Sequence, residues 1–261
     1  MKKTVIALAV VLVASGGIHA QTTKKDSEPE STGSFFFGGT GGPDAFGYTY
    51  ADSTNPECAF QWVDITGSNP AGHGDDTGVA VALGGAGFDF YGTLHNSLGF
   101  ASNGYLTDAA GDLTDFTNDC PQPNATDPSP TLAVYWDDMD AGDSPAADGF
   151  SNYFAVCPRP GPPGLQGCNV FQWNTQHFPG DAGNPIQEMF QAILYDSYHY
   201  VLQFDLTTEA GSSSTSGGEN DTATIALDYA CNAAASINPP LAVCFFHPNP
   251  IPVELESVTV E

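Results

Sequence analysis

The residues with the clearest chemical potential are four aspartates in the segment Trp-Asp-Asp-Met-Asp-Ala-Gly-Asp at positions 136–143. Asp137, Asp138, Asp140 and Asp143 fall within seven residues, next to a glycine. Ca²⁺ takes about six to eight oxygen ligands, mostly from carboxylates and from the carbonyls of a turning loop. The four aspartates therefore predict a Ca²⁺ site, with a solvated acidic loop as the simpler alternative.

The spacing of these aspartates is not that of an EF-hand, because no glutamate occupies the twelfth position of the loop. Successive side chains of a strand point to opposite faces. A strand that ends near residue 136 would therefore separate Asp137 from Asp138. The segment His73-Gly74-Asp75-Asp76 could supply further ligands if its loop lies nearby.

An even number of cysteines indicates disulfides in an exported chain. The six cysteines are Cys58, Cys120, Cys157, Cys168, Cys231 and Cys244. Six cysteines allow fifteen connectivities. Cys157–Cys168 and Cys231–Cys244 are close in sequence and could each close a loop, which would leave Cys58–Cys120. A zinc site is disfavoured, because the sequence has no Cys-x-x-Cys pair and no histidine at zinc spacing from these cysteines.

The sequence contains no recognisable catalytic motif, and it predicts a protein that is not an enzyme. It lacks the Gly-x-Ser-x-Gly of serine hydrolases and the His-Glu-x-x-His of zinc proteases. Nothing selects one glycosidase pair from the 31 acidic residues. The histidines after residue 20 are scattered, and each is expected at the surface or in a hydrogen bond rather than as a ligand. These histidines are His73, His95, His177, His199 and His247.

The first twenty residues have the pattern of a bacterial signal peptide. Lys2 and Lys3 precede an apolar run at 4–15, and small residues lead to Ala20. This run is shorter than the roughly 20 residues that span a bilayer. We therefore expect a secreted, extracellular protein that does not insert into a membrane after the signal is cleaved.

The charge of the chain excludes several classes of partner. After residue 20, only Lys24, Lys25 and Arg159 are basic, against 31 acidic residues, a net charge of −28. Nucleic-acid binding and adsorption to anionic membranes both need lysine and arginine. Binding of cations such as Ca²⁺ and simple solubility through self-repulsion remain as explanations of the acidity.

Short apolar and aromatic segments separated by turn residues predict an all-β chain. The expected strands are 60–65, 79–83, 88–91, 132–136, 153–156, 170–173, 189–195, 200–206, 224–229 and 241–246. In 200–206, Tyr200, Leu202, Phe204 and Leu206 lie on one face, and Gln203 and Asp205 lie on the other. This alternation predicts one buried and one solvated face. No stretch has apolar residues at sustained helical spacing.

These features predict an antiparallel two-sheet β-sandwich or jelly roll, stapled by disulfides, over residues 44–250. Residues 21–43 are expected to be a flexible leader, and 251–261 a C-terminal tail. The Gly- and Ser-rich composition of 209–219 predicts a mobile loop between two strands. The three tryptophans are expected to anchor the core: Trp62, Trp136 and Trp173.

Four local patterns in order suggest a family. The first pattern is Gly-Pro-Asp-Ala-Phe-Gly-Tyr-Thr-Tyr (42–50) with Phe-Gln-Trp-Val-Asp-Ile (60–65), and the second is Phe-Asp-Phe-Tyr-Gly (88–92) with Ala-Ser-Asn-Gly-Tyr-Leu-Thr (101–107). The third is Cys-Pro-Gln-Pro-Asn (120–124) with Ala-Val-Tyr-Trp-Asp-Asp-Met-Asp (133–140). The fourth is Val-Phe-Gln-Trp-Asn (170–174) with Phe-Gln-Ala-Ile-Leu-Tyr (190–195). Together they resemble a secreted bacterial β-sandwich module found alone or beside proteases and adhesins. They are also distantly similar to the nidogen-like extracellular domain. The resemblance implies a non-catalytic β-module used for attachment or as an accessory.

The expected function is therefore binding or attachment outside the cell, to a glycan, a surface protein or matrix material, with possible stabilisation by Ca²⁺. An extracellular hydrolase with an unrecognised site and a structural component of an envelope or biofilm are the alternatives. A deep cleft with converging acid, base or metal groups would indicate an enzyme. A shallow groove would indicate a binding module, and self-complementary sheet edges would indicate a structural protein.

Overall fold

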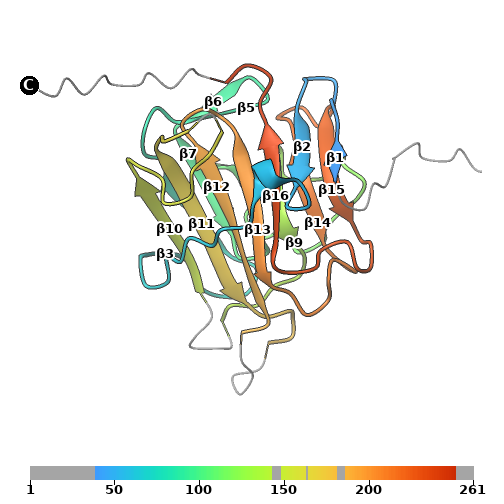
Figure 1. Ribbon diagram of the computed structural model, residues 1–261. Coiled ribbons are helices and arrows are strands. Elements are labelled where there is room, and N and C mark those ends of the chain that lie inside the picture. Colours follow the sequence, from blue (N-terminus) through green and yellow to red (C-terminus); the bar gives the residue numbers. More distant parts are fainter. Residues whose placement is uncertain (1–38, 143–147, 163, 181–185, 251–261) are drawn as a thin grey trace, which may run out of the picture. The chain divides into compact units, whose positions relative to one another are not determined.

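The protein is described by a computed structural model. The described residues are 39–142, 148–162, 164–180 and 186–250. The predicted signal peptide (1–20), most of the predicted leader, the tail 251–261 and Asp143 lie outside them. The described residues form antiparallel strands and one short 3₁₀ turn, Pro56–Cys58 (Figure 1). No helix among them is long and apolar enough to cross a membrane.

The strands form two large sheets that pack together, which confirms the predicted all-β sandwich. The eight-stranded sheet has the order β1 (Thr40–Gly41), β2 (Thr49–Asp52), β16 (Leu241–Phe246), β13 (Tyr200–Leu206), β12 (Glu188–Tyr195), β11 (Cys168–Thr175), β10 (Asp148–Phe154) and β3 (Asn69–Gly72). The six-stranded sheet has the order β15 (Ala226–Cys231), β14 (Thr215–Glu219), β9 (Thr131–Trp136), β8 (Tyr105–Asp108), β7 (Ser97–Ala101) and β4 (Gly78–Ala82). A two-stranded ribbon pairs β5 (Phe88–Phe90) with β6 (Thr93–His95). β1 lies before residue 44, so the sheet begins inside the segment assigned to the leader.

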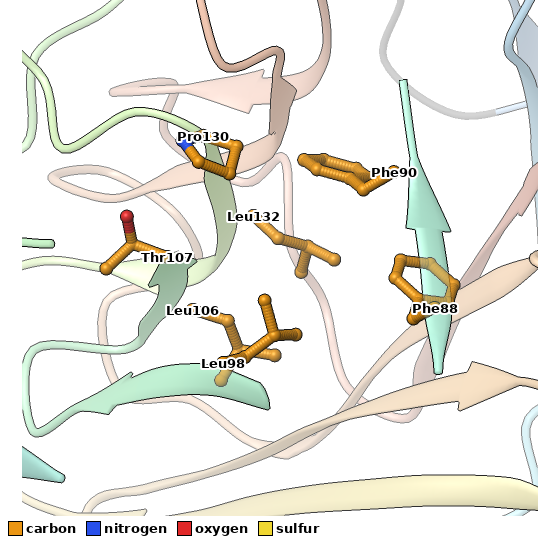
Figure 2. Close-up of a pocket in the computed structure, with 7 residues that line it drawn as sticks. All are labelled: Phe88, Phe90, Leu98, Leu106, Thr107, Pro130 and Leu132. Carbon is orange, nitrogen blue, oxygen red and sulfur yellow. The ribbon is translucent and has the colours of Figure 1, made fainter. Parts of the chain in front are cut away.

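Aromatic rings fill the space between the two sheets. Phe100 of β7 stacks on Trp173 of β11, with ring centroids 4.2 Å apart. Trp136 and Trp173 are buried, as the sequence predicts, whereas Trp62 is only half-buried. Figure 2 shows a void among apolar side chains of β5, β7, β8 and β9, with a volume of about 10 Å³. A void of this size is too small for a substrate.

The outer face of the eight-stranded sheet is covered, which corrects the prediction of a solvated face. Gln203 of β13, predicted to face water, is fully buried, while Asp205 is exposed as expected. Leu206, predicted to point into the core, is 38% exposed. Residues 200–204 are therefore all buried, because a further layer of chain lies over the sheet there, and the two residues at the end of the strand are both exposed.

Glutamine side chains hold this outer layer in place. Gln203 donates to the carbonyl of Gln61 (2.8 Å) and accepts from its N–H (2.7 Å). Gln172 of β11 accepts from the N–H of Ile65 (3.0 Å). The segment Phe60–Ile65 is predicted as a strand, but it is irregular in the structure. Side-chain amides, rather than a neighbouring strand, provide hydrogen bonds to its backbone.

The predicted mobile loop at 209–219 contains a buried strand. Thr215–Glu219 forms β14, which pairs with β9 on one side and β15 on the other. Its two glycines allow a close approach of neighbouring groups. A Cβ on Gly218 would lie 2.8 Å from the ring of Phe90 and 2.9 Å from the hydroxyl of Tyr200. The Gly- and Ser-rich composition therefore serves close packing in this segment, and the loop prediction is wrong for its second half.

All six cysteines form disulfides, but only one predicted pair is correct. The structure has Cys157–Cys168, Cys58–Cys244 and Cys120–Cys231. The predicted Cys231–Cys244 and Cys58–Cys120 pairs are wrong. Cys231 and Cys244 lie in different sheets, on β15 and β16, in spite of their closeness in sequence. Cys58 follows β2, which pairs directly with the strand that carries Cys244.

Loss of Cys58–Cys244 should destabilise the fold more than loss of Cys157–Cys168. The two bridges span 186 and 11 positions, and in the chain-entropy model stabilisation grows with the logarithm of the loop length. The paired Cys58→Ser, Cys244→Ser variant should lose about 5 kcal/mol of unfolding free energy, and the Cys157→Ser, Cys168→Ser variant about 3 kcal/mol. Urea unfolding under oxidising conditions measures both losses. Equal losses would contradict the loop-entropy explanation.

Candidate metal sites and buried carboxyl groups

The two aspartates that follow β9 diverge, as the alternation of a strand predicts. Asp137 joins a cluster that contains a histidine, and Asp138 joins a different cluster with the 73–76 loop. Asp140 is buried, and its Oδ1 accepts a hydrogen bond from the backbone N–H two residues later (2.7 Å). Asp143 lies outside the described residues. Asp137 and Asp138 therefore do not converge on one point.

Asp138 lies beside Asp75 and Asp76, so the 73–76 loop is near the acidic segment as anticipated. One carboxylate oxygen of each residue lies within 4.8 Å of the other two. The buried Asn103 ties the segments together, because its Nδ2 donates to Asp76 (2.9 Å) and its Oδ1 accepts from the N–H of Met139 (2.9 Å). Burial, followed by the charges of Asp76 and Asp75, raises the pKa of Asp138 to about 6. A bound cation would relieve this repulsion.

Asp137 lies in a second group, the His177 cluster, which consists of Asp137, His177, Glu188, Glu209 and Ser213. The Nδ1 of His177 is 3.5 Å from Asp137 Oδ2, and its Nε2 is 3.1 Å from Glu188 Oε1. The Ser213 hydroxyl lies within hydrogen-bond distance of both Asp137 and Glu209. Burial raises the pKa of Asp137. Burial alone would lower the pKa of His177, but the nearby carboxylates, above all Glu188, raise it on balance.

The His177 cluster brings together residue types that also occur in hydrolases, but it does not have the geometry of a catalytic triad. In a triad the serine is hydrogen-bonded to the imidazole that removes its proton. Here the hydroxyl of Ser213 contacts carboxylates, and the two nitrogens of His177 face Asp137 and Glu188. Sequence analysis missed the cluster because its members come from four segments that only the fold brings together.

A third group, the buried-acid cluster, consists of Asp127, Glu219 and Asp228 around Gln122. Gln122 donates its N–H to Asp228 (2.9 Å), and its side-chain amide is 3.4 Å from Asp127. The Oδ1 atoms of Asp127 and Asp228 are shielded from solvent and accept no hydrogen bond. Burial, reinforced by the charge of Glu219, raises the pKa of Asp127 to about 7 and that of Asp228 to about 8. Burial also raises the pKa of Glu219.

Two shallow grooves lie along the open sides of the sandwich. The edge groove has a volume of about 200 Å³ and runs between the edge strands β3 and β4 and their neighbours β10 and β11. Its polar lining is Asn69, Ser151, Asn152, Tyr153 and Asn169. The opposite groove, of about 320 Å³, is lined by Asp52, Thr54, Tyr229 and Asn238 among others. Neither groove contains a member of the three clusters described above.

Comparisons with family models, with curated proteins and with solved structures find no match to this chain. The resemblance to a secreted nidogen-like module therefore stays a prediction from the sequence motifs.

The buried-acid cluster should make the protein more stable at acidic than at alkaline pH. A carboxyl group with a raised pKa binds more protons in the folded than in the unfolded state, so its contribution to stability is lost as pH rises from about 4 to about 8. The Asp228→Asn variant keeps an uncharged side chain, so its melting temperature should fall less over this range. At pH 8 it should be on the order of 1–3 kcal/mol more stable than the wild type.

Calorimetric unfolding from pH 4.5 to 8.5 tests this expectation, with the exposed Asp205→Asn as the control for a simple change in net charge. If Asp228→Asn and Asp205→Asn flatten the pH profile equally, the buried carboxyl groups are not its cause.

Proposed function

We propose that the protein is a secreted, non-catalytic module that attaches to extracellular carbohydrate through the edge groove. The observation that supports this proposal is an unpaired polar side chain in that groove. Within the described part of the chain, the side chain of Ser151 makes no hydrogen bond, and it lies on the same face of the sheet as Tyr153 and Asn169, which also line the groove. A hydroxyl without a protein partner can bind the hydroxyl groups of a sugar.

The remaining polar groups of the edge groove are fixed by the fold. Asn169 accepts from the N–H of Gly84 (2.8 Å), and Asn69 donates to the carbonyl of Ser151 (3.2 Å). In the opposite groove, Asp52 is already engaged by Thr54 and Tyr229. The unpaired hydroxyl of Ser151 in the edge groove is accessible to a ligand, whereas the unpaired hydroxyl of Ser236 in the opposite groove is shielded from solvent.

The charge of the chain favours an uncharged glycan. The net charge of the full sequence is −26, which repels phosphorylated, sulfated or other acidic ligands. Neutral sugars are recognised by hydrogen bonds and by contact with aromatic rings. Tyr153, which lines the groove, is partly exposed, and its hydroxyl is held by Asp196 (3.3 Å).

Several features of the chain support an extracellular location. Disulfides persist in oxidising compartments, so the three bridges fit an extracellular location. The predicted signal peptide and the motifs that resemble nidogen-like modules support the same location. The tightly filled core supports a non-catalytic role.

A structural role in an envelope or biofilm is the second candidate, and one observation favours it. β4 is an edge strand with mostly exposed small apolar residues, among them Val79 at 43% exposure. Such an edge can pair with a strand of another molecule. Concentration-dependent assembly that Val79→Lys abolishes would favour this role over carbohydrate binding.

Substitution of Ser151 should weaken binding to the glycan. We expect a glycan array to identify a neutral oligosaccharide, and Ser151→Ala to weaken binding of that ligand by about 3–10-fold, the value of one lost hydrogen bond. Asn238→Ala, in the opposite groove, is the control and should bind as the wild type does. An array without a specific ligand, or a loss confined to Asn238→Ala, would overturn the assignment to the edge groove.

We also propose that Ca²⁺ stabilises the module at Asp75, Asp76 and Asp138. Each of these residues offers a carboxylate oxygen within 4.8 Å of the others, and the connection through Asn103 fixes Asp76 relative to the chain after β9. Hard oxygen ligands of this kind suit Ca²⁺.

Calcium should raise the melting temperature of the wild type and not that of Asp138→Asn. For a dissociation constant of about 0.1–1 mM, typical of extracellular modules, 5 mM Ca²⁺ adds about 1–2 kcal/mol, or roughly 2–8 °C. Differential scanning calorimetry with Ca²⁺ or EDTA measures the shift, with Asp205→Asn as the control. An equal shift in Asp138→Asn would place the ion elsewhere, and no shift in the wild type would remove calcium from the proposal.

A further inference from the structure

The His177 cluster has the arrangement of a metal site rather than that of a surface ion pair. Ligand atoms of Asp137, His177 and Glu209 all lie within 4.8 Å of one another. Asp137 Oδ2 lies 3.5 Å from the Nδ1 of the imidazole. One nitrogen and two carboxylate oxygens from three separate segments therefore converge on one point.

The hydroxyl of Ser213 lies between two carboxylates of the cluster. Its Oγ lies within hydrogen-bond distance of both Asp137 Oδ2 and Glu209 Oε2 (2.8 Å to the latter). A hydroxyl has a single proton, so it can donate to only one of the two carboxylates at a time. The second carboxylate then faces an oxygen lone pair, which a cation would stabilise.

Glu188 lies on the opposite side of the imidazole and supplies an independent indication. It is fully buried, its Oε1 is 3.1 Å from His177 Nε2, and the N–H of Thr208 donates to the same oxygen (2.9 Å). Its Oε2 is shielded and has no hydrogen-bond partner. Histidines that bind metals usually donate their other ring N–H to a carboxylate, and Glu188 lies within ion-pair distance of Nε2. Glu188 is therefore placed to hold Nε2–H and to direct Nδ1 toward Asp137 and Glu209.

Within the part of the chain that the structure describes, no lysine or arginine compensates the charge of the cluster. Arg159 is the only lysine or arginine among the described residues, and it donates to Tyr195 (2.9 Å) and to the carbonyl of Ala59 (2.9 Å) instead. Three carboxylates and one imidazole retain a negative charge even when His177 is protonated. Buried charges of this kind are normally paired or bound to metal.

We propose that Asp137, His177 through Nδ1, and Glu209 bind a divalent transition-metal ion of the Zn²⁺ class, with Glu188 as the positioning residue behind the histidine. An imidazole ligand favours such an ion over Ca²⁺, which prefers oxygen ligands alone. The site is distinct from the proposed Ca²⁺ site, because Asp138 points to the other face.

A metal ion at this position would connect the two sheets. Asp137 directly follows β9 of the six-stranded sheet, and Glu209 lies in the connection between β13 and β14. His177 follows β11 and Glu188 begins β12, which are neighbours in the eight-stranded sheet (Figure 1). The ion would thus act as a cross-link between the layers.

Zinc titration of the disulfide-bonded chain without its predicted signal peptide tests the proposal. After removal of metals with EDTA and dialysis, isothermal titration calorimetry should show one Zn²⁺ bound per chain in the wild type. Glu209→Gln and His177→Asn should abolish this binding, and Glu188→Gln should weaken it by about 10–100-fold. Glu209 is exposed, so its substitution should leave the fold intact. Asp205→Asn is the matched surface control.

Two further measurements separate ligation from a structural effect. Co²⁺ in place of Zn²⁺ should give visible absorption bands that disappear in Glu209→Gln, and the ¹⁵N resonance of His177 Nδ1 should shift on addition of Zn²⁺. Asp138→Asn should bind Zn²⁺ as the wild type does, so failure of the Ca²⁺ proposal leaves this one intact. No Zn²⁺ binding by the wild type, or undiminished binding by both Glu209→Gln and His177→Asn, would overturn the assignment.

Discussion

The scarcity of cationic side chains is the constraint on which the rest of this structure depends. The sequence has 31 acidic residues and five basic ones, and only Arg159 of these five lies in the described part of the chain. Carboxylates must therefore be stabilised by other means. Asp44 accepts hydrogen bonds from three successive backbone N–H groups, those of Phe46, Gly47 and Tyr48. Each ion pair identified among the described side chains uses a histidine in place of lysine or arginine. Asp228 accepts only one such hydrogen bond within the described ranges, from Gln122, and its burial raises its pKa to about 8, which favours a bound proton in place of a cation.

The same constraint explains why the buried polar groups on the outer face of the eight-stranded sheet are neutral amides, which lie beside an apolar cluster that includes Val63, Val170 and Ile193. Gln172, Gln191 and Gln203 are opposite one another on β11, β12 and β13, so their amides form a row across the sheet. This row binds the backbone of the segment around Gln61 and Ile65 without introducing charge. The disulfide Cys58–Cys244 fixes one end of the same layer, and Arg159 lies against its sulfur (3.4 Å). Hydrogen bonds, a disulfide and one buried cation thus hold this layer on the sheet without salt bridges to lysine.

The sequence was sufficient to predict the fold class and most strands, because strand alternation and turn residues are local signals. It was insufficient wherever burial depends on a distant segment. Gln203 has the residue type of a solvated face but is covered by a segment about 140 positions away. The glycines of β14 have the composition of a loop, yet they make room for Phe90 and Tyr200. The pairing of Cys58 with Cys244 depends on which strands are neighbours, which no sequence spacing reveals. At the candidate sites, alternation correctly separated Asp137 from Asp138, whereas the approach of His177 and Glu188 follows from sheet order.

The position of Asp137 and Asp138 at the end of β9 has a consequence for any cation that binds there. The two side chains belong to different clusters, but they are adjacent in sequence, and burial together with the charges of Asp76, Asp75 and then Asp137 raises the pKa of Asp138. A cation bound to Asp137 would lower the pKa of Asp138, and it would also repel a second cation bound there. Binding free energies are reciprocal, so the balance of these two effects would change the affinity of both sites by the same factor. A strand end that places neighbouring carboxylates in two clusters would thus couple two sites without any conformational change.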